Sequence, residues 1–293
     1  MTLDVSRTAF RGFSLVAQKP WVVLVWALLY LLGFVVIGAI AVGVAFAAGI
    51  ENFTPQVDPT APPNYPVGAM LAIIPVVLIG FLALMSVFLC GAYRMVLRPE
   101  EGGLAYLRLG AAEVRMMGLL FVSAVMWLLL YFGVSLVAGM LGAITLGIGL
   151  LITIPAALAL LLFLAVKMSL AAVINFAEGK IGIAESWKLT DRNFWNLFLI
   201  YLIVFAVLMV IGVAFFMIQT AAQGAVGMPT VFNLQAGQTA PEYTGAALAV
   251  TGVLFVAQML VSSANMIFSY APHAEAYLQL KPKPADRVGE VFS

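Results

Sequence analysis

Six apolar stretches, each long enough to cross a bilayer, dominate the sequence. A membrane-spanning helix needs about 20 predominantly apolar residues, and the six stretches cover residues 21–48, 67–95, 116–139, 144–171, 194–222 and 245–270. Only 9% of the chain is charged, where a soluble domain carries roughly 25%. The pattern predicts an all-α polytopic membrane protein with six transmembrane helices arranged as three hairpins. They form one transmembrane domain over residues 1–270, and residues 271–293 form a cytoplasmic tail.

The lysine and arginine residues lie on alternate connections. All 14 of them fall in the N-terminal arm, after the second and fourth stretches, and in the segment that begins at Lys281. The other three connections hold none, and their only charged residues are Glu51, Asp58 and Glu242. Cytoplasmic loops concentrate Lys and Arg. The distribution therefore predicts that both termini are cytoplasmic.

A short segment with helical periodicity precedes each odd-numbered stretch. Apolar residues such as Phe13, Leu107 and Trp187 recur at spacings of three, four and seven opposite polar residues, which indicates an amphipathic helix. Such a helix can lie in the plane of the cytoplasmic interface. We therefore expect one unit, an in-plane helix followed by a hairpin, to occur three times. The approximate repeats are residues 5–93, 102–167 and 181–270.

Basic residues at the predicted cytoplasmic corners are candidate contacts for anionic lipid headgroups. The candidates are Arg94, Arg98, Arg108, Arg115, Lys167, Lys188 and Arg192. A role in setting the topology alone explains these charges equally well. Tryptophan prefers the same depth of the bilayer, and the candidate interfacial anchors are Trp21, Trp187 and Trp195.

Lys167 allows more than one interpretation because it lies near the end of the fourth stretch. We favour a side chain that extends to the headgroups. The alternatives are an ion pair with Glu178 or Glu185 and a contact to a lipid phosphate. Close by, Thr190 or Asp191 is expected to cap the helix that begins near residue 194.

A stripe of polar residues follows one face of the sixth stretch. Its members are Gln258, Ser262, Asn265 and Ser269, which are spaced four, three and four residues apart. Hydrogen bonding between membrane helices is the favoured interpretation, because no ionisable group joins the stripe. The alternative is a polar pathway for a neutral solute.

Catalysis finds no support in the sequence. One histidine, His273, and one cysteine, Cys90, do not make a metal site of the usual kinds, and we expect His273 to be a surface residue. Motifs of the G-x-S-x-G and H-E-x-x-H types are missing. We therefore expect no enzymatic activity and no cofactor, and the net charge of +1 gives no reason to expect nucleic-acid binding.

The stretch AESWKLTDRNFWNLFLIYL, which begins at Ala184, resembles a segment of one bacterial integral-membrane family. That family is named after the membrane domain of glycerophosphoryl diester phosphodiesterases and is similar to the YciC-like inner-membrane proteins. The matching positions are Lys167, Ser169, Leu170, Ala171, Glu178, Ala184, Ser186, Trp187, Leu189, Thr190, Asn193, Phe194 and Trp195. The run YRMVLRPEEGG from Tyr93 resembles a subgroup from alphaproteobacteria.

The resemblance implies a multi-pass protein of the bacterial inner membrane and little chemistry. Some relatives carry a soluble phosphodiesterase domain, but an enzyme acting on lipid phosphodiesters rests on the family name alone. We expect a lipid-interacting or accessory membrane protein, with anionic lipids as partners. The alternative is a transporter or channel for a neutral or lipidic solute. A membrane-protein partner or a homo-oligomer is compatible with either function.

Overall fold

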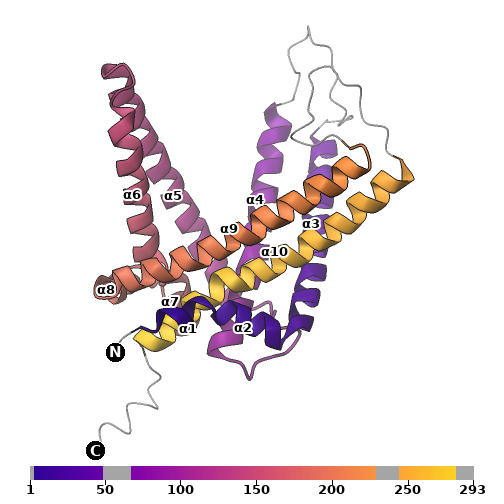
Figure 1. Cartoon of the computed structure of the whole chain (residues 1–293), viewed down its shortest axis with the longest axis horizontal. Helices are drawn as coiled ribbons and strands as arrows, with labels where there is room; N and C mark the ends of the chain where they lie inside the picture. The colour runs from indigo at the N-terminus through magenta and orange to yellow at the C-terminus, as the bar shows by residue number, and fades with distance from the viewer. Residues whose placement is uncertain (1–2, 49–66, 229–243, 282–293) are drawn as a thin grey trace, which may run out of the picture.

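The computed structural model describes residues 3–48, 67–228 and 244–281, and the regular elements in these ranges are all α-helices. Six helices are long and apolar enough to cross a membrane. They are α3 (Pro20–Ala47), α4 (Val67–Leu97), α5 (Ala111–Ile144), α6 (Leu150–Met168), α9 (Phe194–Ala225) and α10 (Gly245–Leu280) (Figure 1). The all-α class and the six apolar helices are thus confirmed. The predicted features outside the described residues are Glu51, Asp58, Glu242, Lys283, Arg287 and the tail from residue 282 onward.

Four short helices occupy the connections at one end of the long helices. They are α1 (Val5–Ala9), α2 (Arg11–Gln18), α7 (Ala171–Glu178) and α8 (Ile183–Asp191). Helices α1 and α2 lie where the first amphipathic helix was predicted, and α8 lies where the third was predicted. Their in-plane orientation stays a prediction. Helix α7 was not anticipated, because all its residues after Ala171 lie in the connection between the fourth stretch and the third predicted amphipathic helix.

The second amphipathic helix is replaced by a buried turn, so that prediction is wrong. Two consecutive non-glycine residues, Ala105 and Tyr106, have positive φ angles of 51° and 65°, which no helix tolerates. Trp26 Nε1 donates to the Ala105 carbonyl oxygen at 2.8 Å, and Arg94 Nη1 donates to the Tyr106 carbonyl oxygen at 2.6 Å. These side chains take the carbonyl groups that a helix would need, and α5 begins only at Ala111.

The long helices pack closely at one end and diverge toward the other (Figure 1). Helices α9 and α10 run side by side, and α10 packs against both α3 and α4. Helices α5 and α6 form a hairpin that contacts α4 and α9 near one end and then leads away from them. The end at which the helices meet carries Arg94, Lys167 and Lys281, and we call it the basic end.

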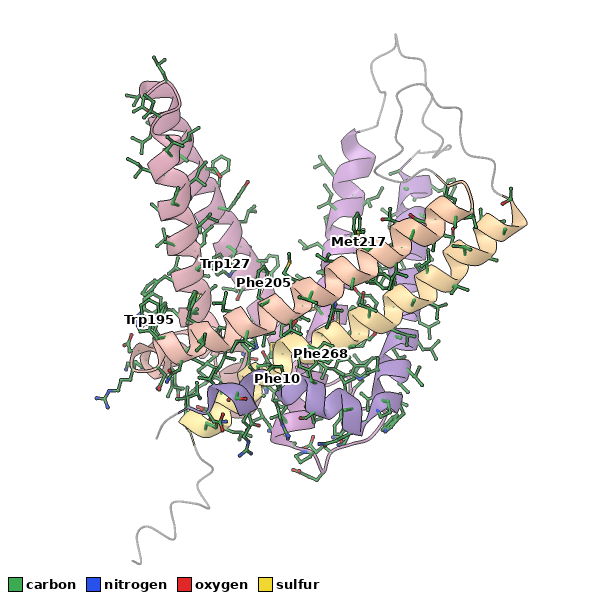
Figure 2. All side chains as sticks on the ribbon, viewed as in Figure 1. Phe10, Trp127, Trp195, Phe205, Met217 and Phe268 are labelled. Carbon is green, nitrogen blue, oxygen red and sulfur yellow. The ribbon has the colours of Figure 1, made fainter. Side chains whose placement is uncertain are left out.

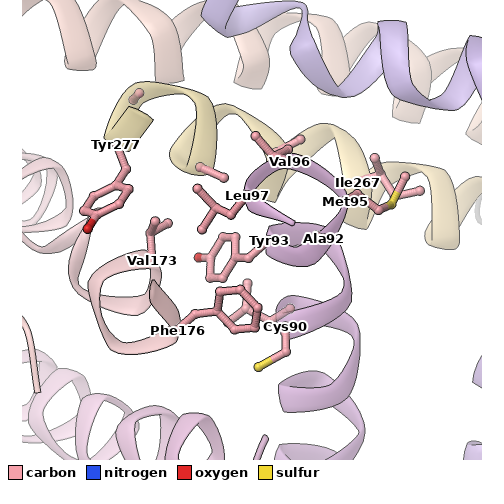
Figure 3. Close-up of a cluster of buried hydrophobic side chains, with 14 of the residues drawn as sticks. Cys90, Ala92, Tyr93, Met95, Val96, Leu97, Val173, Phe176, Ile267 and Tyr277 are labelled. Atoms are coloured by element: carbon pink, nitrogen blue, oxygen red, sulfur yellow. The ribbon is translucent and has the colours of Figure 1, made fainter. Parts of the chain in front are cut away.

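Most of the packed core lies at the basic end. The cluster in Figure 3 joins Cys90 and Tyr93 of α4 to Phe176 of α7 and Tyr277 of α10, all of them buried. Elsewhere many apolar side chains of the spans are exposed, such as Leu128 on α5. A bilayer solvates such surfaces as well as a neighbouring helix does. The packing is therefore dense where the chain leaves the apolar layer and loose within it.

Helix α10 continues ten residues past its predicted end at residue 270 and forms part of this core. Pro272 lies inside the helix without ending it. Glu275 is buried and lies 3.2 Å from Arg7 Nε and 3.4 Å from Arg11 Nε. Gln279 Nε2 donates to Thr8 Oγ1 at 3.1 Å. The first residues assigned to the tail are therefore helical and hold the N-terminal arm in place.

Helix α2 crosses α10 at very short range. A β-carbon added at Gly12 would lie 2.6 Å from the Cα atom of Phe268, closer than real contacts allow. The adjacent Phe13 ring stacks on the Phe268 ring, with 4.0 Å between centroids and an interplanar angle of 13°. Figure 2 shows Phe268 on α10 beside the N-terminal helices. Glycine is thus required at position 12 for the two backbones to approach this closely.

Candidate functional site

Arg94, a predicted headgroup contact, is an interior residue. Its side chain is 4% exposed, and Nη2 donates to Glu113 Oε1 at 2.6 Å. The Phe176 ring centroid lies 5.4 Å from its guanidinium carbon. A buried cation is costly unless a carboxylate and further hydrogen bonds compensate for the lost water. The structure therefore corrects the prediction for Arg94, because burial leaves no surface that a headgroup could reach.

Arg98 and Arg108 are exposed and share one carboxylate. Glu101 Oε1 lies 3.6 Å from Arg98 Nη1, and Glu101 Oε2 lies 3.3 Å from Arg108 Nη1. Exposed pairs of this kind contribute little to stability. Arg115, on the first turns of α5, is exposed, and among the described residues no carboxylate pairs with it. These three arginines remain available to headgroups, the first two in competition with Glu101.

Lys167 pairs with Asp191 at the end of α8, not with Glu178 or Glu185. Its side chain is buried, and Nζ lies 5.4 Å from the Trp187 ring centroid. The favoured interpretation, a side chain that extends to the headgroups, is therefore wrong.

The prediction that Thr190 or Asp191 caps the helix that begins near residue 194 is wrong as well. Asn193 is the N-terminal boundary residue of α9, and it makes no side-chain cap bond.

Lys188 and Arg192 are exposed at the junction of α8 and α9, and within the described part of the chain no carboxylate pairs with either. Two exposed tryptophans flank them: Trp187 is 38% exposed and Trp195 is 75% exposed. Trp195 lies at the α8 end of α9 in Figure 2. The four residues Trp187, Lys188, Arg192 and Trp195 are called the α8 corner below. The remaining predicted anchor, Trp21, is 48% exposed at the start of α3.

Aromatic packing fixes the α8 corner. The ring of Phe163 on α6 lies edge-on to Trp187, with 6.0 Å between centroids. Phe194 packs 5.4 Å from Phe163 and 5.4 Å from Trp195. Such pairs add to the stability that burial alone gives. The two exposed tryptophans are thus held in place by rings behind them.

A cluster of alternating charges joins α7 and α8 to the end of α10. Lys281 Nζ lies 2.5 Å from a carboxylate oxygen of both Glu178 and Glu185, and Lys180 Nζ lies 2.7 and 2.6 Å from the other two oxygens. Hydrogen bonds from Lys180 and Lys281 lower the pKa of Glu185. Hydrogen bonds to Glu178 and Glu185 raise the pKa of Lys281. These charges neutralise one another, so neither lysine is a good candidate for lipid.

Two residues of the polar stripe on α10 hydrogen-bond to each other, and the other two do not. Gln258 Nε2 donates to Ser262 Oγ at 3.1 Å within the helix. Asn265 Oδ1 is buried and, among the described residues, has no hydrogen-bond donor. Ser269 lines a cavity between α6, α9 and α10. Within the described residues, these four side chains therefore make no hydrogen bond to another helix, and the favoured interpretation, bonding between helices, is not confirmed.

The cavity has a volume of about 530 Å³ and a polar end next to the basic end of the bundle. There Tyr201 Oη donates to Ser169 Oγ at 2.8 Å. The Tyr201 ring stacks on the His273 imidazole, with 4.7 Å between centroids and an interplanar angle of 23°. The rest of the wall is apolar and includes Leu162 and Phe205, which are more than half exposed. The cavity therefore opens sideways between α6 and α9.

His273 is not the surface residue that the sequence suggested. It lines the cavity, and its Nδ1 atom is buried without a hydrogen bond of normal geometry in the described structure, with the backbone of Ser269 and Tyr270 nearby. The i, i+4 spacing of the polar stripe continues from Ser269 to His273, and that signal could have found it. Tyr201 gave no comparable signal, because it lies alone among apolar residues, and Ser169 was named only as a position of the family resemblance.

The described residues form neither a metal site nor an exposed nucleophilic cysteine. No group of three His, Cys, Asp or Glu side chains there could hold a metal ion. Cys90 is buried in the core among apolar side chains. Among the described residues that line the cavity, none is an aspartate or a glutamate.

Comparison with protein-family models, with curated proteins and with solved structures found no match to this chain. The resemblance to the phosphodiesterase-associated membrane family stays a prediction. Six helices able to cross a bilayer indicate a multi-pass membrane protein.

Proposed function

We propose that this chain is a lipid-interacting protein of the bacterial inner membrane, without enzymatic activity, that binds anionic headgroups at the α8 corner. The observation that carries the proposal is the exposure of Lys188 and Arg192, with no carboxylate partner in the described structure, between Trp187 and Trp195. Tryptophan favours the headgroup depth, and unpaired cations there attract anionic lipids. The proposal takes both termini to be cytoplasmic, as the distribution of Lys and Arg predicts, so the α8 corner would lie at the inner leaflet.

The α8 corner is the preferred site for anionic headgroups, because carboxylates neutralise most of the other predicted basic residues. Arg94 and Lys167 are buried and paired, and Arg98 and Arg108 face Glu101. Each cation near an anionic surface contributes about 1 kcal/mol. A cation that already has a carboxylate partner contributes less, because its charge is partly cancelled. Arg115 on α5 is the other exposed cation of the predicted set without a carboxylate partner in the described structure.

The double substitution Lys188→Gln with Arg192→Gln tests the proposal. The full chain is reconstituted in nanodiscs of zwitterionic lipid, and binding of fluorescent phosphatidylglycerol is titrated. Loss of two cations worth about 1 kcal/mol each is expected to weaken binding roughly thirtyfold, and added salt is expected to narrow the difference.

Arg98→Gln with Arg108→Gln is the matched control, because it removes the same charge from two exposed arginines that face Glu101. The control is expected to weaken binding by no more than about threefold. Equal losses in the two double variants would assign the effect to net charge and reject the α8 corner as a site.

A carrier for a neutral or lipidic solute is the second candidate. The observation that favours it is the cavity at the open end of the polar stripe. Flux of the solute across vesicles distinguishes a carrier from a protein that only binds lipid. Asn265→Leu should abolish flux while leaving the fold intact if the stripe is a pathway.

A further inference from the structure

We propose that the cavity between α6, α9 and α10 binds an uncharged long-chain amphiphile whose head carries a hydroxyl group, of the monoacylglycerol type. This site is separate from the α8 corner and does not depend on it. The proposal rests on the polarity of the cavity wall, on its size and on the direction in which it opens.

The polar end of the cavity matches a hydroxyl group. Ser169 Oγ already donates to the Val166 carbonyl oxygen at 2.7 Å and accepts from Tyr201. The hydroxyl oxygens of Ser169 and Tyr201 therefore keep acceptor capacity. Ser269 and a neutral imidazole at His273 each offer a donor and an acceptor. A hydroxyl group, which both donates and accepts, can use this set fully.

The cavity does not match a charged head. Among the described residues that line it, none carries a charge. The nearest cation along α6, Lys167, packs against Phe163 and Trp187 on another face of that helix and pairs with Asp191. A phosphate or carboxylate in the cavity would therefore lose its water without gaining a counter-charge, which is strongly unfavourable.

The size and the opening match a hydrocarbon chain. A volume of about 530 Å³ falls within the range of ligand pockets, about 300–1,000 Å³. The apolar wall extends from the polar end along Leu162 of α6 and Phe205 of α9, both of which face the surroundings in part. An acyl chain can thus enter sideways from the bilayer, while the head remains near the basic end.

Native mass spectrometry of the full-length chain in a non-ionic detergent tests the proposal, with 1-oleoylglycerol as the probe. Ala165→Phe fills the cavity and is expected to weaken binding at least tenfold. Ser269→Ala removes one hydrogen-bonding group and is expected to weaken it about fivefold. Ala157→Phe is the matched control, because Ala157 lies on the same helix and lines a different space of about 540 Å³ between α5 and α6. The control is expected to bind like the wild type, with an unchanged unfolding midpoint.

A second probe, oleoyl lysophosphatidate, separates this site from the α8 corner, since it has the same chain and an added phosphate. Ala165→Phe is expected to lose only the uncharged probe, and Lys188→Gln with Arg192→Gln only the charged one. Equal binding of 1-oleoylglycerol to Ala165→Phe and Ala157→Phe would overturn the proposal. Displacement of 1-oleoylglycerol from the wild type by equimolar lysophosphatidate would also overturn it, because the cavity would then accept a charged head.

Discussion

Removing one member of the buried Arg94–Glu113 pair is expected to destabilise the basic end strongly. Both side chains are about 95% buried, at 4% and 5% exposure, and their nitrogen and oxygen atoms are 2.6 Å apart. Arg94→Met leaves the Glu113 carboxylate buried without a partner, which costs about 3–5 kcal/mol. Arg94→Met combined with Glu113→Leu removes both charges. The double variant is expected to recover most of that loss and to remain about 1–2 kcal/mol less stable, because the Tyr106 carbonyl group loses its donor.

Cys90 provides the assay, since it is the only cysteine and lies buried one turn before Arg94. Its labelling by a maleimide during unfolding in mixed micelles reports the opening of the basic-end core. Arg98→Gln serves as the control, because that arginine is exposed. If the free energy of unfolding of the single variant Arg94→Met lies within about 1 kcal/mol of the wild-type value, the buried pair does not stabilise the basic end as described. A double variant that is no more stable than Arg94→Met would lead to the same conclusion.

Two further predictions concern the N-terminal arm and the charge cluster. Gly12→Ala should force α2 away from Phe268, whose Cα atom lies 2.6 Å from the added β-carbon, and lower the free energy of unfolding by about 1–3 kcal/mol in the same labelling assay. The control Gly38→Ala, whose added β-carbon meets nothing within 4 Å, should leave that free energy unchanged. Equal effects of the two variants would reject the close crossing of α2 and α10. The pKa of Glu185 is lowered from its ordinary value of 4.5 by its bonds to Lys180 and Lys281, so its stabilisation is complete above that value and is lost as the pH falls through the lowered pKa. Glu185→Gln should therefore flatten the fall in the unfolding midpoint as the pH drops below 4.5. An unchanged slope would count against the cluster.

The spans could be predicted from sequence because hydropathy alone determines them. Each apolar stretch contains one long helix, although the second, third, fifth and sixth predicted ends were short by 2, 5, 3 and 10 residues. Pro272 favoured an early end for the sixth helix. That bias was overridden because residues 271–280 bury Ala271, Ala274 and Tyr277 in the core.

The partners of the charged residues could not be predicted, because they depend on how the helices pack. Lys167 and Asp191 are 24 residues apart and on different helices, and Arg94 meets Glu113 across a turn that the sequence did not reveal. Charge position predicted which end of the bundle is basic. It could not tell a buried arginine such as Arg94 from an exposed one such as Arg98.

The native mass spectrum of the protein, purified gently from its own membrane, tests most directly whether the α8 corner binds anionic lipid. We expect bound anionic lipid on the wild type, retained by Arg98→Gln with Arg108→Gln and lost from Lys188→Gln with Arg192→Gln. A wild-type protein that carries no anionic lipid would contradict this expectation, as would equal retention by both double variants.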